Sequence, residues 1–444
     1  MAPVPPASPV PPARCLVCAG CGWTAPDTSS LRYPFRCPNA GTDDADHVVT
    51  RRLDAGHVAA AQGDNSNSFI RHRELFTAWH AARTMGMTDA AYVDLVRVLD
   101  EKVAAVDGRG FRVTPFARAQ TLGERLDLEI WVKDETGNVS GSHKSRHLFG
   151  ILLYLAVIER SEKPPLAIAS CGNAALAAAV LARAVERALK VFVPPHAESA
   201  VLEKLHALGA DVVPCPRVPG QQGDPCVHGF HEAVRAGALP FCVQGNENGL
   251  TIEGGETLVE EMLAVGAPAF DHVVIQVGGG ALASSCVQAF ARATQGGLLS
   301  RMPRIHTVQT EGAWPLRRAW ELWREHQRHT GASQEEALRY AGAHRSEFMW
   351  PWAEEPRSIA EGILDDETYD WLAVVRGMAE SGGVPVVADE ATLKEARDLA
   401  REHTGIAVSH TGSAGLAGLL QLQRDGVIKA GERVAVVFSG VERS

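Results

Sequence analysis

Hydrophobic positions along this chain follow two alternating periods, with short polar turns between the segments. Brief apolar runs predict buried strands at 166–170, 190–194, 211–213, 272–277, 304–309 and 433–438. Apolar residues at helical spacing predict helices at 174–188, 200–208, 227–236 and 257–265, with a further helix from Ala283. Because strands joined through helices run parallel, this alternation predicts an α/β fold in which helices cover both faces of the sheet.

The segments outside that region are less regular. Helices are expected within 67–107, strands at 111–116 and 128–133, and a helix from an N-cap at Ser142 to about Arg160. Residues 321–355, rich in Trp, Arg, His and Glu, predict a helical insertion. Residues 1–14 are rich in Pro and Ala and lack the basic start of a signal peptide, so they are expected to be a disordered leader.

The composition is typical of a soluble globular protein, with 45% hydrophobic and 22% charged residues. A length of 444 residues predicts two to three domains. The formal net charge of −10 argues against nucleic acid and anionic membranes as partners. The best apolar run, 148–158, is interrupted and too short to span a bilayer. These features predict a cytoplasmic protein.

A cysteine-rich segment, 15–50, follows the leader and is expected to resemble a zinc ribbon. Cys18 and Cys21 form one knuckle-like turn, while Cys37 begins a second turn that lacks its last cysteine. A structural zinc site needs four ligands, so Cys15, His47 or Asp43 would have to supply the fourth. The alternative is a remnant that packs without metal.

Lys144 is the candidate catalytic residue, placed in the first turn of the predicted helix by the segment 140–147 (SGSHKSRH). Lysine forms a Schiff base with an aldehyde cofactor, and a helix N-terminus favours its neutral, nucleophilic form. The alternative is a surface lysine. Two other segments favour the catalytic interpretation and together suggest a site for pyridoxal phosphate.

The first of these segments follows the strand 272–277 and is expected to bind the cofactor phosphate. It comprises Gly278, Gly279, Gly280, Ala281 and Leu282. Glycines there allow backbone N–H groups to converge on an anion at the start of the next helix. The alternative is a tight turn, although such turns seldom need three glycines. Dinucleotide binding is disfavoured, because the segment is not G-x-G-x-x-G.

The second segment, 170–174 (SCGNA), lies between a predicted strand and helix. Asn173 could donate its amide to the phenolate oxygen of the cofactor, or simply cap the helix. Ser170, Cys171, Gly172 and Asn173 are expected to bind the substrate carboxylate. Ser439 ends the last strand, where a hydroxyl against the pyridine nitrogen would favour elimination and replacement over transamination.

The order of these motifs resembles the tryptophan synthase β-like family, the fold type II pyridoxal-phosphate enzymes. The resemblance covers about 112–443, and the motifs at 141–146, 170–173 and 250–257 are similar to those of threonine synthases and serine/threonine dehydratases. The chain departs from the family pattern at His143, His147 and Cys171. The two histidines either pack at the edge of the cofactor or carry a proton.

The resemblance implies two open sheets, with a large cofactor-binding domain at 51–145 and 245–444 and a small domain at 146–244. It also implies a homodimer and an amino-acid substrate. The expected reaction is α,β-elimination on a hydroxy or β-substituted amino acid, through an aminoacrylate. His143 and Arg146 are further candidates for substrate binding, with Glu253 and 409–411 beside them.

Two alternatives remain open from the sequence. One is a threonine synthase-like β/γ-replacement enzyme, in which Arg146 would bind the phosphate of the substrate. The other is a catalytically silent protein that still binds the cofactor.

Overall fold

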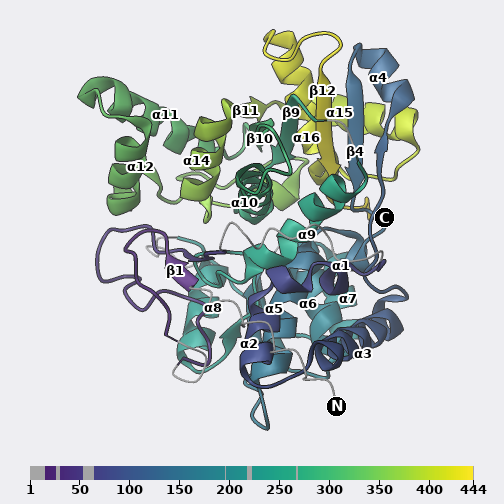
Figure 1. Cartoon of the computed structure of the whole chain (residues 1–444), viewed down its shortest axis with the longest axis vertical. Coiled ribbons are helices and arrows are strands. Elements are labelled where there is room, and N and C mark those ends of the chain that lie inside the picture. Colours follow the sequence, from purple (N-terminus) through teal and green to yellow (C-terminus); the bar gives the residue numbers. More distant parts are fainter. Residues whose placement is uncertain are drawn as a thin grey trace, which may run out of the picture.

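The protein consists of two stacked bodies, each built around its own sheet (Figure 1). The computed structural model describes residues 16–26, 31–53, 65–195, 197–217, 223–266 and 269–443. The predicted leader, 1–14, and Cys15 lie outside the described residues. The six-stranded sheet lies in the upper body of the view and the four-stranded sheet in the lower body, with α9 (Thr251–Ala264) between them.

The six-stranded sheet has the order β11-β10-β9-β12-β4-β3, and only β3 runs antiparallel to its neighbour. Its strands are β3 (Phe116–Arg118), β4 (Glu129–Asp134), β9 (His272–Gln276), β10 (Arg304–Thr310), β11 (Pro385–Ala388) and β12 (Arg433–Phe438). β9 shows why the sheet has two covered faces: Val273 and Ile275 belong to one apolar cluster and Val274 to another. Side chains alternate across a strand, so a continuous apolar run buries both faces.

Helices from distant parts of the chain cover the two faces (Figure 1). One cluster joins α9 with α10 (Ala281–Gln295), α11 (Pro315–Thr330), α12 (Gln334–Ala343), α13 (Arg345–Phe348) and α14 (Trp371–Ser381). The other joins α4 (Gln120–Leu126), α15 (Glu390–Thr404) and α16 (His410–Arg424). The predicted insertion at 321–355 is therefore helical, and it extends one covering layer.

The four-stranded sheet, β7-β6-β5-β8, is parallel throughout. Its strands are β5 (Leu166–Ala169), β6 (Leu189–Val193), β7 (Asp211–Pro214) and β8 (Leu239–Pro240), and α5 (Lys144–Ile158), α6 (Asn173–Ala184), α7 (Ser199–Ala207) and α8 (Pro225–Arg235) belong to the same body. α1 (Ser68–Arg71), η2 (Arg73–Leu75), α2 (Thr77–Thr84) and α3 (Asp89–Asp107) pack with α5 and α6. The helices of 68–107 thus share the core of the smaller sheet, whereas the sequence division placed them with the larger one.

The cysteine-rich segment carries a short antiparallel pair, β1 (Leu16–Cys18) and β2 (Val49–Arg51). It contacts both bodies. Asp46 accepts a hydrogen bond from Trp371 Nε1 at 3.1 Å, and Gly249 N donates to Phe35 O at 2.9 Å. None of the described helices combines the length and the apolar character needed to cross a membrane.

The structure confirms the predicted α/β class and its main strands, and it differs at several boundaries. The strand expected at 111–116 begins only at Phe116. Ser142 does not cap α5, because it ends the 3-10 helix η3 (Val139–Gly141) and pairs with Gly440 in an isolated β-bridge. α9 begins at Thr251, ahead of 257, and includes Gly254, where a Cβ would lie 2.0 Å from the carbonyl oxygen of Arg146. Close packing against α5 therefore overrides the low helix propensity of glycine.

Candidate active site and metal centre

Lys144 is the first residue of α5, and the preceding residue anchors it to the end of β12. His143 N donates to Ser439 O at 3.0 Å, so the lysine lies where the central strands end. Its side chain is half-buried. Desolvation lowers the pKa of Lys144, although the carboxylates of Asp365 and Asp370 oppose that shift. The amine is therefore closer to its neutral, nucleophilic form than an exposed lysine.

The predicted phosphate loop, Gly278 to Leu282, connects β9 to α10. Among the described residues, no side chain caps α10, which leaves the N–H groups of the first turn of this 15-residue helix available to an anion. Gly280 has φ of 96°, and a Cβ added to Gly278 would lie 2.2 Å from Oδ2 of Asp365. The glycines are thus required both by backbone conformation and by the close approach of another segment.

Asn173 is the first residue of α6 and is held from the end of the chain. Arg443 donates to its Oδ1 from Nη2 at 2.8 Å and from Nε at 3.2 Å. A Cβ added to Gly440 would lie 3.0 Å from Nδ2 of Asn173, so this nitrogen faces the end of β12. The amide is therefore oriented with its donor toward the region of Lys144. Arg443 follows the last predicted motif and belongs to none, so no local pattern of the sequence indicated its role.

Ser439 directly follows β12, and a buried glutamine fixes the role of its hydroxyl. Gln276 Nε2 lies 2.9 Å from Gly412 O, 3.1 Å from Val437 O and 2.5 Å from Ser439 Oγ. Two carbonyl acceptors fix the orientation of the amide, and its nitrogen can only donate. The Ser439 hydroxyl is thus an acceptor from Gln276, and its own proton is free for a ring nitrogen. Gln276 is the one polar side chain in the interior of the apolar run 272–277, which was an overlooked signal.

His143 and His147 form a buried chain with a backbone carbonyl. His143 Nδ1 lies 3.2 Å from His147 Nε2, and His147 Nδ1 lies 2.8 Å from Thr251 O. Because the carbonyl only accepts, His147 carries its proton on Nδ1 and accepts from His143. Burial lowers the pKa of His147 to about 3 and that of His143 well below its ordinary value. Both rings are therefore neutral.

Arg146 does not face the substrate region, which corrects the expectation that it binds substrate. Its guanidinium donates to Glu135 Oε2 at 2.8 Å and to Glu261 Oε1 at 2.6 Å, and it is 1% exposed. Lys133 adds a second buried cation, 2.5 Å from Glu261. Against the cost of burial, Arg146 and Lys133 lower the pKa of Glu261 to about 2. The two cations and the two carboxylates balance one another within the core, so the Arg146 guanidinium is neutralised there.

The remaining substrate candidates lie at the end of β5. Ser170, Cys171 and Gly172 form the loop into α6, and Ser170 Oγ accepts from Gly172 N at 3.5 Å. Desolvation and the nearby carboxylate of Glu361 raise the pKa of the Cys171 thiol, so it is no thiolate nucleophile.

Two weaker candidates also have positions in the structure. Glu253 does not line this region, because it accepts from the backbone N–H and hydroxyl of Thr77 at 2.8 and 2.5 Å. The segment 409–411 begins α16, and its Thr411 accepts from Gly362 N at 3.0 Å.

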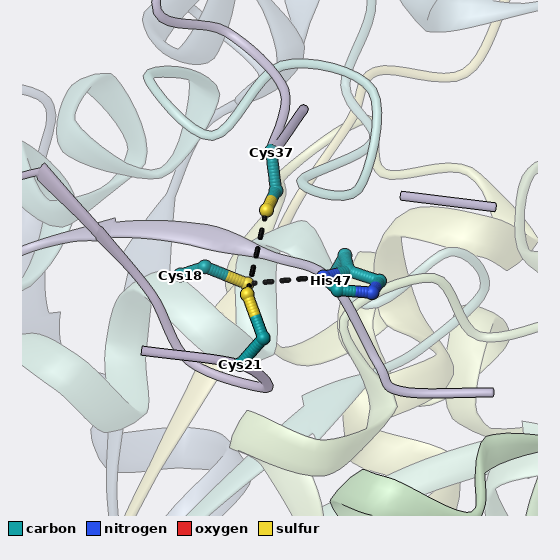
Figure 2. A group of neighbouring side chains, drawn as sticks. All are labelled: Cys18, Cys21, Cys37 and His47. Carbon is teal, nitrogen blue, oxygen red and sulfur yellow. Dashed lines mark hydrogen bonds between the residues drawn. The ribbon is translucent and has the colours of Figure 1, made fainter. Parts of the chain in front are cut away.

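The cysteine-rich segment brings four metal-ligand atoms together (Figure 2). The Sγ atoms of Cys18, Cys21 and Cys37 and a ring nitrogen of His47 all lie within 4.8 Å of one another. His47 Nε2 lies 2.7 Å from Asp43 Oδ1, which leaves Nδ1 as the lone-pair nitrogen, 3.5 Å from Cys18 Sγ. Of the three predicted choices for a fourth ligand, the structure favours His47, with Asp43 orienting the ring.

Comparison with known proteins identifies the family. The sequence model of the family 'Pyridoxal-phosphate dependent enzyme' matches residues 109–440, so the chain belongs to this family. It is 25% identical over 331 residues to a threonine synthase of Bacillus sp. (strain ULM1), covering 74% of this chain and 82% of that protein. It is 26% identical over 428 residues to threonine synthase 2, chloroplastic, of Arabidopsis thaliana, covering 92% and 76%. Among solved structures, the L-serine ammonia-lyase from Rhizomucor miehei matches with a TM-score of 0.56 at 18% identity, covering 74% and 94%.

The protein is therefore an enzyme of the fold type II class that uses pyridoxal phosphate. The residues present fit this cofactor. The uncapped start of α10 suits a phosphate, the half-buried Lys144 suits its aldehyde, and Nδ2 of Asn173 and the hydroxyl of Ser439 suit its ring oxygen and ring nitrogen.

Proposed function

We propose that this enzyme catalyses elimination of a β-substituent from an amino acid, in the manner of a serine/threonine dehydratase. The observation that carries the proposal is the pairing of Gln276 with Ser439. Gln276 can only donate to the hydroxyl, so the hydroxyl proton is available to an unprotonated pyridine nitrogen. A neutral ring is a weaker electron sink than a pyridinium, which favours elimination or replacement over transamination.

Each residue of the proposed site has a separate task. Bound pyridoxal phosphate would supply an electron sink for the charge that develops at the substrate α-carbon. Lys144 would hold the cofactor and then remove the α-proton, a role that its lowered pKa supports. The loop 278–282 would hold the phosphate, Asn173 would donate to the ring oxygen, and the N–H groups of 171–173 would hold the substrate carboxylate.

The second candidate is β- or γ-replacement, because the two curated relatives described above are threonine synthases. In such a reaction Arg146 was expected to bind the phosphate of the substrate. Its guanidinium instead donates to Glu135 and Glu261 in the core. The buried ion pairs therefore favour elimination. The third alternative, a protein that binds the cofactor without catalytic activity, is tested by the same assay.

One assay separates these functions. Purified protein loaded with pyridoxal phosphate is given L-serine, L-threonine and O-phosphohomoserine in turn, while keto acid, ammonia and inorganic phosphate are measured. Keto acid from either hydroxy amino acid supports elimination, and phosphate with threonine from O-phosphohomoserine supports replacement instead. A cofactor absorption band that does not respond to any amino acid contradicts both.

Three further assignments belong to the same proposal. Zinc at Cys18, Cys21, Cys37 and His47 would be structural, since all four positions of a tetrahedral site are filled by protein. A homodimer is proposed from the family resemblance, and a cytoplasmic location from a composition typical of a soluble globular protein.

A further inference from the structure

A cavity of about 440 Å³ opens between α3, η3, α6, α7 and the residues that follow β12. Its volume falls within the range of about 300–1,000 Å³ that is usual for sites that bind small molecules. Among the described residues, its lining includes neither Lys144 nor any residue of 278–282. The cavity is therefore separate from the places proposed for the cofactor aldehyde and the cofactor phosphate.

Much of the lining of this cavity is apolar. Leu176 and Val180 lie four residues apart on α6, so their side chains share one face of the helix. Leu208 at the end of α7 and Val441 beyond β12 add further apolar surface. A ligand with an apolar body would remove this surface from water, which is favourable.

The charged residues that line the cavity are mostly cations. They are Arg109, Lys204 and Arg443, with Asp107 as the one carboxylate among the described lining residues. Arg109 Nε lies 3.7 Å from Asp107 Oδ2, whereas Lys204 has no ion-pair partner in the described part of the chain. The lining therefore carries an excess of two positive charges, although the whole chain has a formal net charge of −10. This excess favours an anionic ligand.

Arg443 joins the cavity to the candidate active site. Its Nη2 donates to Ser140 O at 2.6 Å, and its Nη2 and Nε donate to Asn173 Oδ1 at 2.8 and 3.2 Å. Both acceptors are uncharged oxygens, and Nη1 has no hydrogen-bond partner among the described residues. The carboxylates of Asp107 and Glu198 act on the guanidinium electrostatically, without a hydrogen bond to it. The half-buried cation can therefore accept an anion as a direct partner.

Ser140 lines the same cavity with a buried hydroxyl that has no partner. The residue is 7% exposed, and its Oγ makes no hydrogen bond within the described ranges. Its φ of 55° lies in the left-handed region, and Asp107 Oδ2 accepts from its backbone N–H at 3.0 Å. A buried hydroxyl without a partner is costly, and an oxygen of a bound ligand would supply the missing acceptor.

We propose that this cavity binds an effector that carries a phosphate monoester on an apolar body, and that Arg443 links the bound phosphate to Asn173. A phosphate monoester carries a charge of about −1.5 to −2 at pH 7, which matches the positive excess of the lining better than a carboxylate does. Arginine and lysine are strong donors to its oxygens. The link to Asn173 rests on the proposed function, in which this amide donates to the ring oxygen of the cofactor.

Calorimetric titration of four probes into the holoenzyme, freed of unbound pyridoxal phosphate, tests binding without turnover. Phenyl phosphate carries both the dianion and an apolar ring, and benzoate carries the same ring with a single charge. Inorganic phosphate lacks the ring, and phenol lacks the phosphate. At a salt concentration of about 0.15 M, we expect one phenyl phosphate to bind per chain. Benzoate and inorganic phosphate should each bind about tenfold more weakly or worse, and phenol should not bind.

Variants of the lining locate the bound probe. Lys204→Glu should weaken the binding of phenyl phosphate about 10- to 100-fold, because it reverses a charge that lines the cavity. Lys204 is exposed on α7, so the change leaves the core intact. Arg109→Glu, at a second exposed lining residue, should have the same effect. The matched control is Lys394→Glu, the same charge reversal at an exposed position of α15, which should leave the affinity within about twofold.

The visible absorption band of the bound cofactor reports the link through Arg443. A phosphate on the guanidinium competes for the N–H groups that hold Asn173 Oδ1, so saturation with phenyl phosphate should shift the band. No amino acid is present in this titration, and its result is therefore independent of the elimination reaction. A band that stays unchanged at saturation overturns the link to Asn173.

The remaining outcomes concern the site itself. Absence of binding, or equal affinity in the wild type and both lining variants, overturns the site and leaves the elimination proposal intact. Loss of the cofactor band during the titration also overturns it, because the probe then occupies the cofactor site. Tighter binding of benzoate than of phenyl phosphate overturns the phosphate class. Failure of the keto-acid assay, by contrast, contradicts elimination and does not affect the calorimetric result.

Discussion

The chemistry of single residues here depends on the atoms around them. Lys144 and Arg146 are two positions apart on α5, yet the amine lies at the end of the central strands and the guanidinium lies in the core between two glutamates. Arg146 is neutralised by its two glutamates, whereas Lys144 is the proposed catalytic residue. Substitutions at the two positions should therefore have different consequences.

For Lys144→Ala, we expect loss of the visible absorption of bound pyridoxal phosphate and a fall in kcat of at least about 10³-fold, because the covalent link and the base are both removed. Absorption spectra and keto-acid assays measure the two effects. Lys163→Ala, at an exposed lysine outside the site, is the control and should behave as wild type. Full turnover by Lys144→Ala would contradict the assignment.

For Arg146→Ala, we expect the free energy of unfolding to fall by about 3–5 kcal/mol, because Glu135 and Glu261 lose their buried partner. Urea unfolding followed by tryptophan fluorescence measures the change. Arg339→Ala, on the exposed face of α12, should alter stability by less than about 0.5 kcal/mol. Unchanged stability with a raised KM for a phosphorylated substrate would instead place Arg146 in the site.

At the scale of elements, β9 and β10 are linked by a second histidine pair inside the sheet. Val384 N donates to His306 Nδ1 at 3.2 Å, His306 Nε2 lies 2.9 Å from His272 Nδ1, and His272 Nε2 lies 3.1 Å from Glu432. His306 accepts at Nδ1 and donates from Nε2 to His272, which in turn accepts at Nδ1 and donates from Nε2 to Glu432. Each ring therefore carries one proton and is neutral. Burial lowers the pKa of His306 to about 3, with His272 contributing.

This pair predicts a pH dependence that a single variant can isolate. The pKa of His306 is lower in the folded protein than in the unfolded chain. Its contribution to the free energy of unfolding is therefore fully present above about pH 6.5 and falls as the pH drops toward 3. Glutamine can accept from Val384 and donate to His272 without titrating. The stability of wild type relative to His306→Gln should therefore decrease by about 1.4 kcal/mol per pH unit below pH 6.5. Urea unfolding at pH 7.5, 6.5 and 5.5 measures it, and a constant difference would contradict the assignment.

At the scale of the whole molecule, the cysteine-rich segment connects the candidate metal ligands to the upper body. His47 follows Asp46, whose carboxylate holds Trp371 at 3.1 Å and Arg345 at 3.3 Å. Trp371 begins α14 directly after the loop 361–370. A metal bound by these candidate ligands would therefore stabilise the loop that packs against Gly278 and Gly279.

We expect the purified protein to contain about one equivalent of zinc, because four ligands complete a tetrahedral site. Strong chelation should remove it, lower the melting temperature and make three additional thiols reactive, namely Cys18, Cys21 and Cys37. His47→Ala should lose the metal, whereas Asp43→Asn should retain it with an affinity about 10- to 100-fold weaker. Elemental analysis and thiol titration check this, and full stability without metal would contradict a structural role.

Much of this protein was determined by the sequence alone. The α/β class and most central strands follow from apolar runs, and the cofactor follows from Lys144, Asn173, the glycine turn and Ser439, because such local motifs need particular residues at particular backbone positions. Only the tertiary structure decided what meets across the chain. In the folded protein Arg146 pairs with Glu135 and Glu261, and His47 lies beside the three cysteines. Asp365 likewise lies beside Gly278. These contacts join residues far apart in sequence, and their free energy depends on burial and charge pairing that no local pattern encodes.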